Sequence, residues 1–215
     1  MLQRHFYTAG FAVYITLGVI SHNIAMQPRS ILFVDGENLT FRFQEMVKAG
    51  HVPRSDTVHV ADTFVWNSNV TRSRYDALEN VIRVHYYTSA TGDHDKIKAL
   101  QEELAKQTFV SPTSSGFHHG QVVPLVFKKL AQSKKTRNVD IQIVIDIMRY
   151  AFTDAIDRIF LASGDGDYIP LITEVMRRGK QVELLAFSSG LNAALFPLVD
   201  RVHKIDDKFF KMNVE

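Results

Sequence analysis

Residues 158–179 read Arg158-Ile-Phe-Leu-Ala-Ser-Gly-Asp-Gly-Asp-Tyr-Ile-Pro-Leu-Ile-Thr-Glu-Val-Met-Arg-Arg-Gly179. The apolar run at 159–162 lacks polar alternation, which is typical of a central parallel strand covered on both faces. An acidic turn with two glycines follows at 163–167, and apolar residues then recur at helical spacing until Gly179, a common helix stop. The segment predicts one buried strand, one acidic turn and one helix. Because ligands of open α/β sheets bind at the carboxyl ends of strands, we expect a functional site in this turn.

The two carboxylates of this turn also have a purely structural explanation, with Asp165 as a turn former and Asp167 as a helix N-cap. A second strand with the same pattern weighs against that explanation alone. Residues 31–34 (Ile-Leu-Phe-Val) are another apolar run, and Asp35-Gly-Glu-Asn38 follows it before a helical segment. Two strands that end in acid-glycine turns favour a functional role over turn formation alone.

Composition bounds the class of protein. A chain of 215 residues with 46% hydrophobic and 22% charged residues is an ordinary globular protein with one large domain or a domain plus an extension. The formal net charge of +2 does not by itself indicate a nucleic-acid binder, so any such signal must be local. The chain has no cysteine, which excludes disulfides, thiolate zinc sites and cysteine nucleophiles. We expect a cytoplasmic protein.

The N-terminal segment has an apolar run at residues 6–20, preceded by Arg4 and His5, and so resembles a weak signal peptide. The run is too short for a membrane span, and Asn23-Ile-Ala25 is a poor signal-peptidase site. Met26 opens the sequence directly before the first apolar strand. We interpret residues 1–28 as an N-terminal extension outside the catalytic unit, without stable membrane insertion.

Strand and helix patterns alternate along the rest of the chain. Strands are predicted at 81–87, 122–127, 181–187 and 201–205, and helices at 39–49, 73–80, 93–107, 138–152 and 191–198. Residues 57–66 fit either a short strand or the start of a helix. Residues 108–120 are rich in Ser, Pro and Gly and predict a loop, in which His118 and His119 are exposed and do not bind metal. The alternation predicts an α/β fold, a parallel sheet with helices on both faces.

A basic run, Lys128-Lys129-Leu-Ala-Gln-Ser-Lys134-Lys135-Thr-Arg137, contains five cations and no acid. It leads into the predicted helix at 138–152, with Asp140 near the positive end of the helix dipole. A run of this kind is either a solvated surface or a phosphate-binding segment. Asp146 lies about 120° around the helix from Asp140, so a site role and an ion pair with Arg149 remain equally open.

Three motifs together resemble those of the NYN domain family: Phe33-Val-Asp-Gly-Glu-Asn-Leu39, Asn138-Val-Asp-Ile141 with Asp146 behind it, and Ala162-Ser-Gly-Asp-Gly-Asp-Tyr-Ile-Pro-Leu171. The resemblance covers roughly residues 29–206 and leaves 207–215 as a C-terminal tail. Arg137-Asn138 stands where the family usually has lysine-glycine. The resemblance implies a PIN-like, Rossmann-like sheet in a three-layer sandwich, similar to that of metal-dependent ribonucleases.

Carried over to this chain, the resemblance implies a catalytic and metal-binding cluster of Asp35, Asp140, Asp165 and Asp167. Asn38 would be a polar partner and Asp146 a less certain member. Mg²⁺ or Mn²⁺ is the expected cofactor, because these hard cations bind carboxylates and leave positions open for water and phosphate. Four converging aspartates without a cation would repel one another.

The expected substrate is single-stranded RNA, cut by a metal-activated water and gripped by Lys128, Lys129, Lys134, Lys135 and Arg137. An RNA-binding or scaffolding domain with little turnover is the alternative. A phosphatase or receiver-like phosphotransfer domain is disfavoured, because Asp35-Gly-Glu37 lacks an Asp-x-Asp pattern and no phosphate-binding loop of the Gly-x₄-Gly-Lys type occurs. The sequence leaves open whether the chain forms a homo-oligomer.

Overall fold

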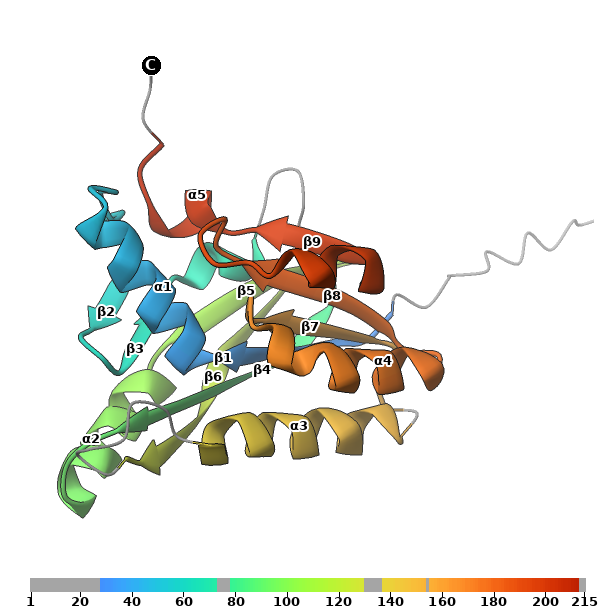
Figure 1. The fold of residues 1–215 in the computed structure, drawn as a ribbon, viewed down its shortest axis with the longest axis horizontal. Coiled ribbons are helices and arrows are strands. Elements are labelled where there is room, and N and C mark those ends of the chain that lie inside the picture. The colour runs from blue at the N-terminus through green and yellow to red at the C-terminus, as the bar shows by residue number, and fades with distance from the viewer. Residues whose placement is uncertain (1–27, 73–77, 130–136, 154, 213–215) are drawn as a thin grey trace, which may run out of the picture.

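A computed structural model describes residues 28–72, 78–129, 137–153 and 155–212 of the chain (Figure 1). A seven-stranded sheet has the order β5-β6-β4-β1-β7-β8-β9. Its strands are β1 (Ser30–Asp35), β4 (Val81–Ala90), β5 (Thr108–Thr113), β6 (Gly116–Lys128), β7 (Arg158–Ala162), β8 (Gln181–Ala186) and β9 (Arg201–Lys204). All neighbours pair in parallel except β5, which runs antiparallel to β6.

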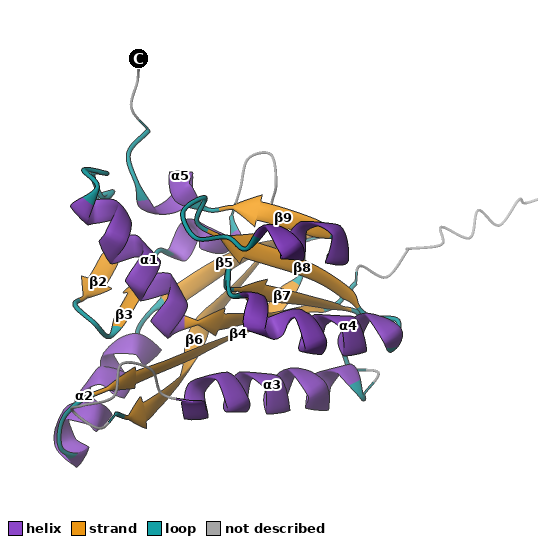
Figure 2. Ribbon diagram, viewed as in Figure 1, coloured by secondary structure: helices purple, strands orange, loops and turns teal. Residues whose placement is uncertain are grey.

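Helices surround this sheet (Figure 2). They are α1 (Gly36–Lys48), α2 (His94–Ala105), α3 (Arg137–Ala151), α4 (Ile169–Arg177) and α5 (Asp206–Phe209). Short 3₁₀ turns are η1 (Ser68–Thr71), η2 (Gly166–Tyr168) and η3 (Ala193–Leu198), and β2 (Val58–Val60) pairs with β3 (Phe64–Trp66) in a separate hairpin. The fold is therefore α/β with a mostly parallel sheet.

The middle of the sheet fixes the place of the site. From β1 the chain moves outward to β4 and β6, and it then returns through α3 to β7 on the other side of β1. Strand order reverses between β1 and β7, and in open α/β sheets ligands bind at the carboxyl ends of the strands at such a reversal. Asp35 is the last residue of β1, and Ser163 directly follows β7.

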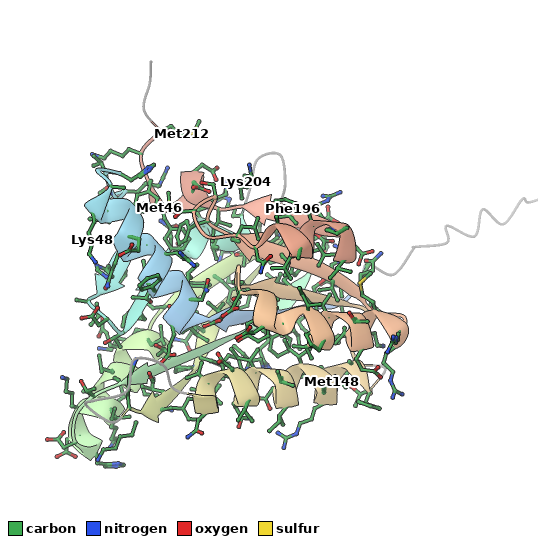
Figure 3. All side chains as sticks on the ribbon, in the orientation of Figure 1. Met46, Lys48, Met148, Phe196, Lys204 and Met212 are labelled. Carbon is green, nitrogen blue, oxygen red and sulfur yellow. The ribbon has the colours of Figure 1, made fainter. Side chains whose placement is uncertain are left out.

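Two hydrophobic cores lie on opposite faces of β1. Leu32 and Val34 pack in one core with Phe43 of α1, whereas Ile31 and Phe33 belong to the other core with residues of α3 and α4. Side chains alternate between the faces of a strand, so helices on both faces require an unbroken apolar run. The two apolar runs, at 31–34 in β1 and at 159–162 in β7, are buried and lie side by side in the sheet, which confirms the predicted buried central strand. Helix α1 also has a buried and an exposed side: Met46 is buried in the core, and Lys48 points outward (Figure 3).

The structure corrects the prediction of a loop at residues 108–120. That segment forms β5, the hairpin turn and the start of β6, and His118 and His119 are exposed residues of β6. The hairpin is stabilised by buried contacts that short-range composition does not reveal, since Phe109 is 1% exposed and the Ser111 hydroxyl donates to the carbonyl of Leu78. Gly116 supplies the left-handed backbone of the turn, with a φ of +139°.

Other outcomes are simpler. Residues 57–66, left open between strand and helix, form β2 and β3. The helix expected at 73–80 lies mostly outside the described residues. Phe209 and Phe210, in the expected C-terminal tail, are core residues, and the Phe210 ring stacks on Phe43 at a centroid distance of 5.0 Å. Within the described ranges, the helices are too short or too polar to cross a membrane.

Candidate active site

Asp35 is the centre of the candidate site and is 2% exposed. Its Oδ1 accepts a hydrogen bond from the backbone N–H of Asn38 at 3.0 Å, which makes Asp35 the N-cap of α1. Its Oδ2 accepts from the hydroxyl of Ser163 at 3.0 Å and from that of Tyr168 at 3.2 Å. Groups following β1 and β7 therefore hold a single carboxylate in a fixed position.

Burial raises the pKa of Asp35 to about 6, and the charges of Asp140 and Glu37 act in the same direction. The hydrogen bonds from Asn38 and Ser163 oppose this rise in pKa without cancelling it. Desolvation favours the neutral acid, whereas the repulsion from Asp140 and Glu37 is what a cation bound beside the ionised carboxylate would offset. The site combines a buried anion with a further negative charge beside it.

Tyr168 connects the two carboxylates and was missed by the sequence analysis. Its hydroxyl lies 3.2 Å from Oδ2 of Asp35 and 3.4 Å from Oδ1 of Asp140. Burial, followed by the charges of Asp35 and Asp140, raises the pKa of Tyr168, so the hydroxyl stays a neutral donor. Its one proton serves one carboxylate at a time. The only sequence signal was its place next to Asp167 in the third motif.

The acidic turn has both a structural and a site role. Asp165 caps η2, because its Oδ1 accepts from the N–H of Asp167 at 3.0 Å. The structural role predicted for Asp165, that of a turn former, is therefore confirmed. Asp167 lies inside η2 and does not cap a helix, so the N-cap role considered for it is wrong. Asp165 is half-buried and its charge adds to the rise in pKa of Tyr168, whereas Asp167 is exposed. The turn carries the acidic surface from Asp35 toward solvent.

Asn38 ties α1 to this turn, since its Oδ1 accepts the N–H of Gly164 at 3.3 Å. A side chain at Gly164 would have its Cβ 2.9 Å from the carbonyl oxygen of Gly190, so the turn requires glycine there. The polar partner expected at Asn38 is thereby placed between the two acid-glycine turns.

Asp146 has hydrogen-bond partners that differ from those of Asp35. Its Oδ1 lies 3.1 Å from Nη1 of Arg149, and its Oδ2 accepts from the Tyr87 hydroxyl and from Nε2 of Gln142, each at 3.0 Å. These contacts support the ion-pair alternative.

The basic run is only partly described. Lys128 is exposed at the end of β6, and Nζ of Lys129 lies 3.8 Å from Oε1 of Glu37, which also accepts the hydroxyl of Ser89. Lys134 and Lys135 lie outside the described residues, and Arg137 begins α3. Lys129 therefore lies beside Glu37 in the first turn of α1, and Glu37 follows Asp35 by two residues.

In the part of the chain that the structure describes, no three His, Asp or Glu side chains are grouped closely enough to hold a metal by themselves. Asp35 and Asp140, joined through Tyr168, form a pair instead. Mg²⁺ usually binds proteins through one or two carboxylates and completes its shell with water and substrate phosphates. This donor pair, with Asp165 nearby, therefore fits a hard divalent cation.

Known proteins resemble this chain in family and fold. The family model of the NYN domain matches residues 29–206. Uncharacterized protein MJ0482 of Methanocaldococcus jannaschii is 25% identical over 118 residues, which are 54% of this chain and 49% of that protein, so the match spans about half of the relative's length. The crystal structure of VPA0982, a protein of unknown function from Vibrio parahaemolyticus, matches with a TM-score of 0.55 and 18% identity over 86% of this chain and 96% of that one, which shows the fold alone. Since the family model covers most of the chain, the protein belongs to the NYN domain family.

Proposed function

We propose that the protein is a metal-dependent endoribonuclease that cuts single-stranded RNA. The observation that carries this proposal is a pair of carboxylates, the buried Asp35 and the half-buried Asp140, which both lie within hydrogen-bond distance of the Tyr168 hydroxyl at the strand-order reversal of the sheet. The NYN domain family includes ribonucleases, which supports a phosphodiester hydrolase at this place. A PIN-like three-layer sandwich is the finer description of the fold that goes with this function.

Asp35 and Asp140 would hold Mg²⁺ or Mn²⁺, with Asp165 and Asp167 at the solvent side of the site. When bound, such a cation lowers the pKa of a water molecule and neutralises charge on a phosphate. The protein contributes position: the Asn38 N–H and the Ser163 hydroxyl fix the Asp35 carboxylate, and Tyr168 holds Asp140 beside it. Preorganised groups of this kind need no rearrangement when charge develops in the reaction.

Substrate binding would depend on the cations that flank the acids. RNA is a polyanion and the site is acidic, so a basic rim must offset the repulsion. We assign this role to Lys128, Lys134, Lys135 and Arg137, which precede or begin the helix that carries Asp140, whereas Lys129 faces Glu37.

The test is cleavage of labelled single-stranded RNA by the wild type, Asp35→Asn and Asp165→Asn, with Mn²⁺, with Mg²⁺ and with a chelator. Asp146→Asn is the matched control, because Asp146 bonds Tyr87 and Arg149 and none of the groups that hold the Asp35 carboxylate. We expect cleavage only with metal, loss in both site variants and activity in the control.

Cleavage that survives either site substitution would assign the activity to another site or to a contaminant. RNA binding without cleavage under any metal condition would favour the alternative, an RNA-binding domain with little turnover.

A further inference from the structure

A groove lies beside the acidic site, on the side of α1 that faces β4. One cavity, of about 240 Å³, is lined by Glu37, Thr40, Phe41, Gln44, Asp62 and Lys129. A second, of about 350 Å³, shares Asp62 and Lys129 and extends past Ser89 at the end of β4 to Lys96 in α2. The lining of the groove includes Glu37, which follows Asp35 by two residues in the sequence. The two cavities together are large enough for a group the size of a nucleoside.

The charges in the groove balance. Its lining includes two lysines, Lys96 and Lys129, and two acids, Glu37 and Asp62, so the formal sum is zero. Asp62 accepts from Nε2 of Gln44 at 2.9 Å, and Glu37 accepts from Ser89 and faces Lys129. A balanced groove of this kind gives little net attraction to a phosphate backbone. It suits a neutral group with polar edges and a flat apolar face.

Phe41 offers the matching surface. Its side chain is 53% exposed, it lines the cavity next to Glu37, and the Arg42 guanidinium lies over its ring at 5.3 Å from the centroid. Exposed aromatic rings in grooves of nucleic-acid-binding proteins stack unpaired bases, and an arginine beside the ring adds cation–π attraction.

We propose that this groove binds one unpaired nucleobase with its ribose, stacked on Phe41, in the strand whose phosphate reaches Asp35. This inference rests on the proposed function in one respect, namely that RNA binds at this surface. It assigns the preference for single strands to a specific place, since a base within a duplex is already stacked and does not offer its faces to Phe41. Stacking tolerates any base, so little sequence preference is expected from the groove.

The experiment measures binding of a single-stranded RNA of roughly 12 nucleotides, carrying one 2-aminopurine, in chelator over a series of salt concentrations. Phe41→Ala should weaken binding roughly 5- to 150-fold, the range for loss of one stacked base. The slope of log affinity against log salt should not change, because no phosphate contact is removed. Phe41→Trp should retain the affinity, and 2-aminopurine quenching should be lost in Phe41→Ala.

Phe152→Ala is the matched control. Phe152 is 57% exposed and carries the Arg178 guanidinium 3.9 Å from its ring centroid, but it follows the last residue of α3 and lines neither cavity. Wild-type affinity is expected for this variant.

The inference is overturned if Phe41→Ala binds as the wild type does, if Phe152→Ala weakens binding equally, if the salt slope flattens with Phe41→Ala, or if no single-stranded RNA binds. Because the assay contains no metal, its result is separate from that of the cleavage test. Binding that depends on Phe41 without any cleavage supports the groove and refutes the nuclease proposal. Metal-dependent cleavage together with RNA binding that is unchanged in Phe41→Ala supports the nuclease proposal and refutes the groove.

Discussion

Replacing Asp35 with Asn should stabilise the metal-free protein at pH 8 and have almost no effect at pH 4. Burial raises the pKa of Asp35 from 3.8 to about 6 in the folded protein. The folded state therefore binds a proton more tightly than the unfolded state, so stability is highest below the unfolded pKa and falls as pH rises through about 6. The neutral amide of asparagine removes this dependence.

The magnitude follows from the size of the shift. A rise in the pKa of Asp35 from 3.8 to about 6 corresponds to about 3 kcal/mol of folding free energy at pH 8. Asparagine keeps one oxygen to accept from the Asn38 N–H and presents an amide to Ser163 and Tyr168, so part of the gain is offset by less favourable hydrogen bonds. We expect a net stabilisation of about 1–3 kcal/mol, or roughly 2–12 °C in Tm for a protein of this size.

The assay is urea unfolding in chelator from pH 4 to pH 8, with Asp146→Asn as the control. Asp146 pairs with Arg149, so the control variant should gain no stability at pH 8. A destabilised Asp35→Asn at pH 8, or an equal effect at pH 4 and pH 8, would refute the electrostatic reasoning and assign the role of Asp35 to its hydrogen bonds alone.

Three further predictions use independent readouts. A chain starting at Met26 should fold and keep the activity of the full chain, whereas a large loss in Tm would show that the apolar run at 6–20 contributes to the core. Tyr168→Phe should destabilise the metal-free protein by about 1–2 kcal/mol at pH 8, because two charged groups lose their shared donor; an unchanged urea midpoint would contradict this. Combined alanine substitution of three cations should flatten the slope of log affinity against log salt by up to about 2, at 0.7 per phosphate contact on single strands, and leave cleavage at saturating RNA nearly unchanged. These cations are Lys134, Lys135 and Arg137, and an unchanged slope would mark the run as an ordinary solvated surface.

Periodic patterns gave the regular elements of the fold. The run at residues 31–34 has no polar position, because both faces of β1 are covered, and that local signal is enough to place a strand in the centre of a sheet. Asp93 begins the helix predicted at 93–107, and in the structure it caps α2 by accepting the N–H of Lys96. Caps and apolar periods depend on neighbours in sequence, so they are readable without the tertiary structure.

The hairpin of β5 and β6 could not be predicted from the sequence, because its stability depends on residues distant in the chain. Its Ser, Pro and Gly content is that of a loop, and it is stabilised by burial of Phe109 and by hydrogen bonds of Ser111 with Val81 and Leu78, about 30 residues away. Pairing of this kind depends on the partner strand more than on intrinsic preference. The buried Phe209 and Phe210 were missed because their partner, Phe43, is distant in sequence.

By itself, then, the sequence determined an α/β chain with acid-glycine turns after two central strands, since hydrophobic period and turn chemistry are local properties. Only the tertiary structure decided which aspartates meet. Tyr168 joins Asp35 to Asp140, whereas Asp146, six residues along the same helix, is held by Tyr87 and Arg149. The groove at Phe41 also arises only when α1, β4 and α2 come together. Distances between side chains and the water excluded from around them depend on elements far apart in the chain, and these set both the pKa of Asp35 and the shape of the site.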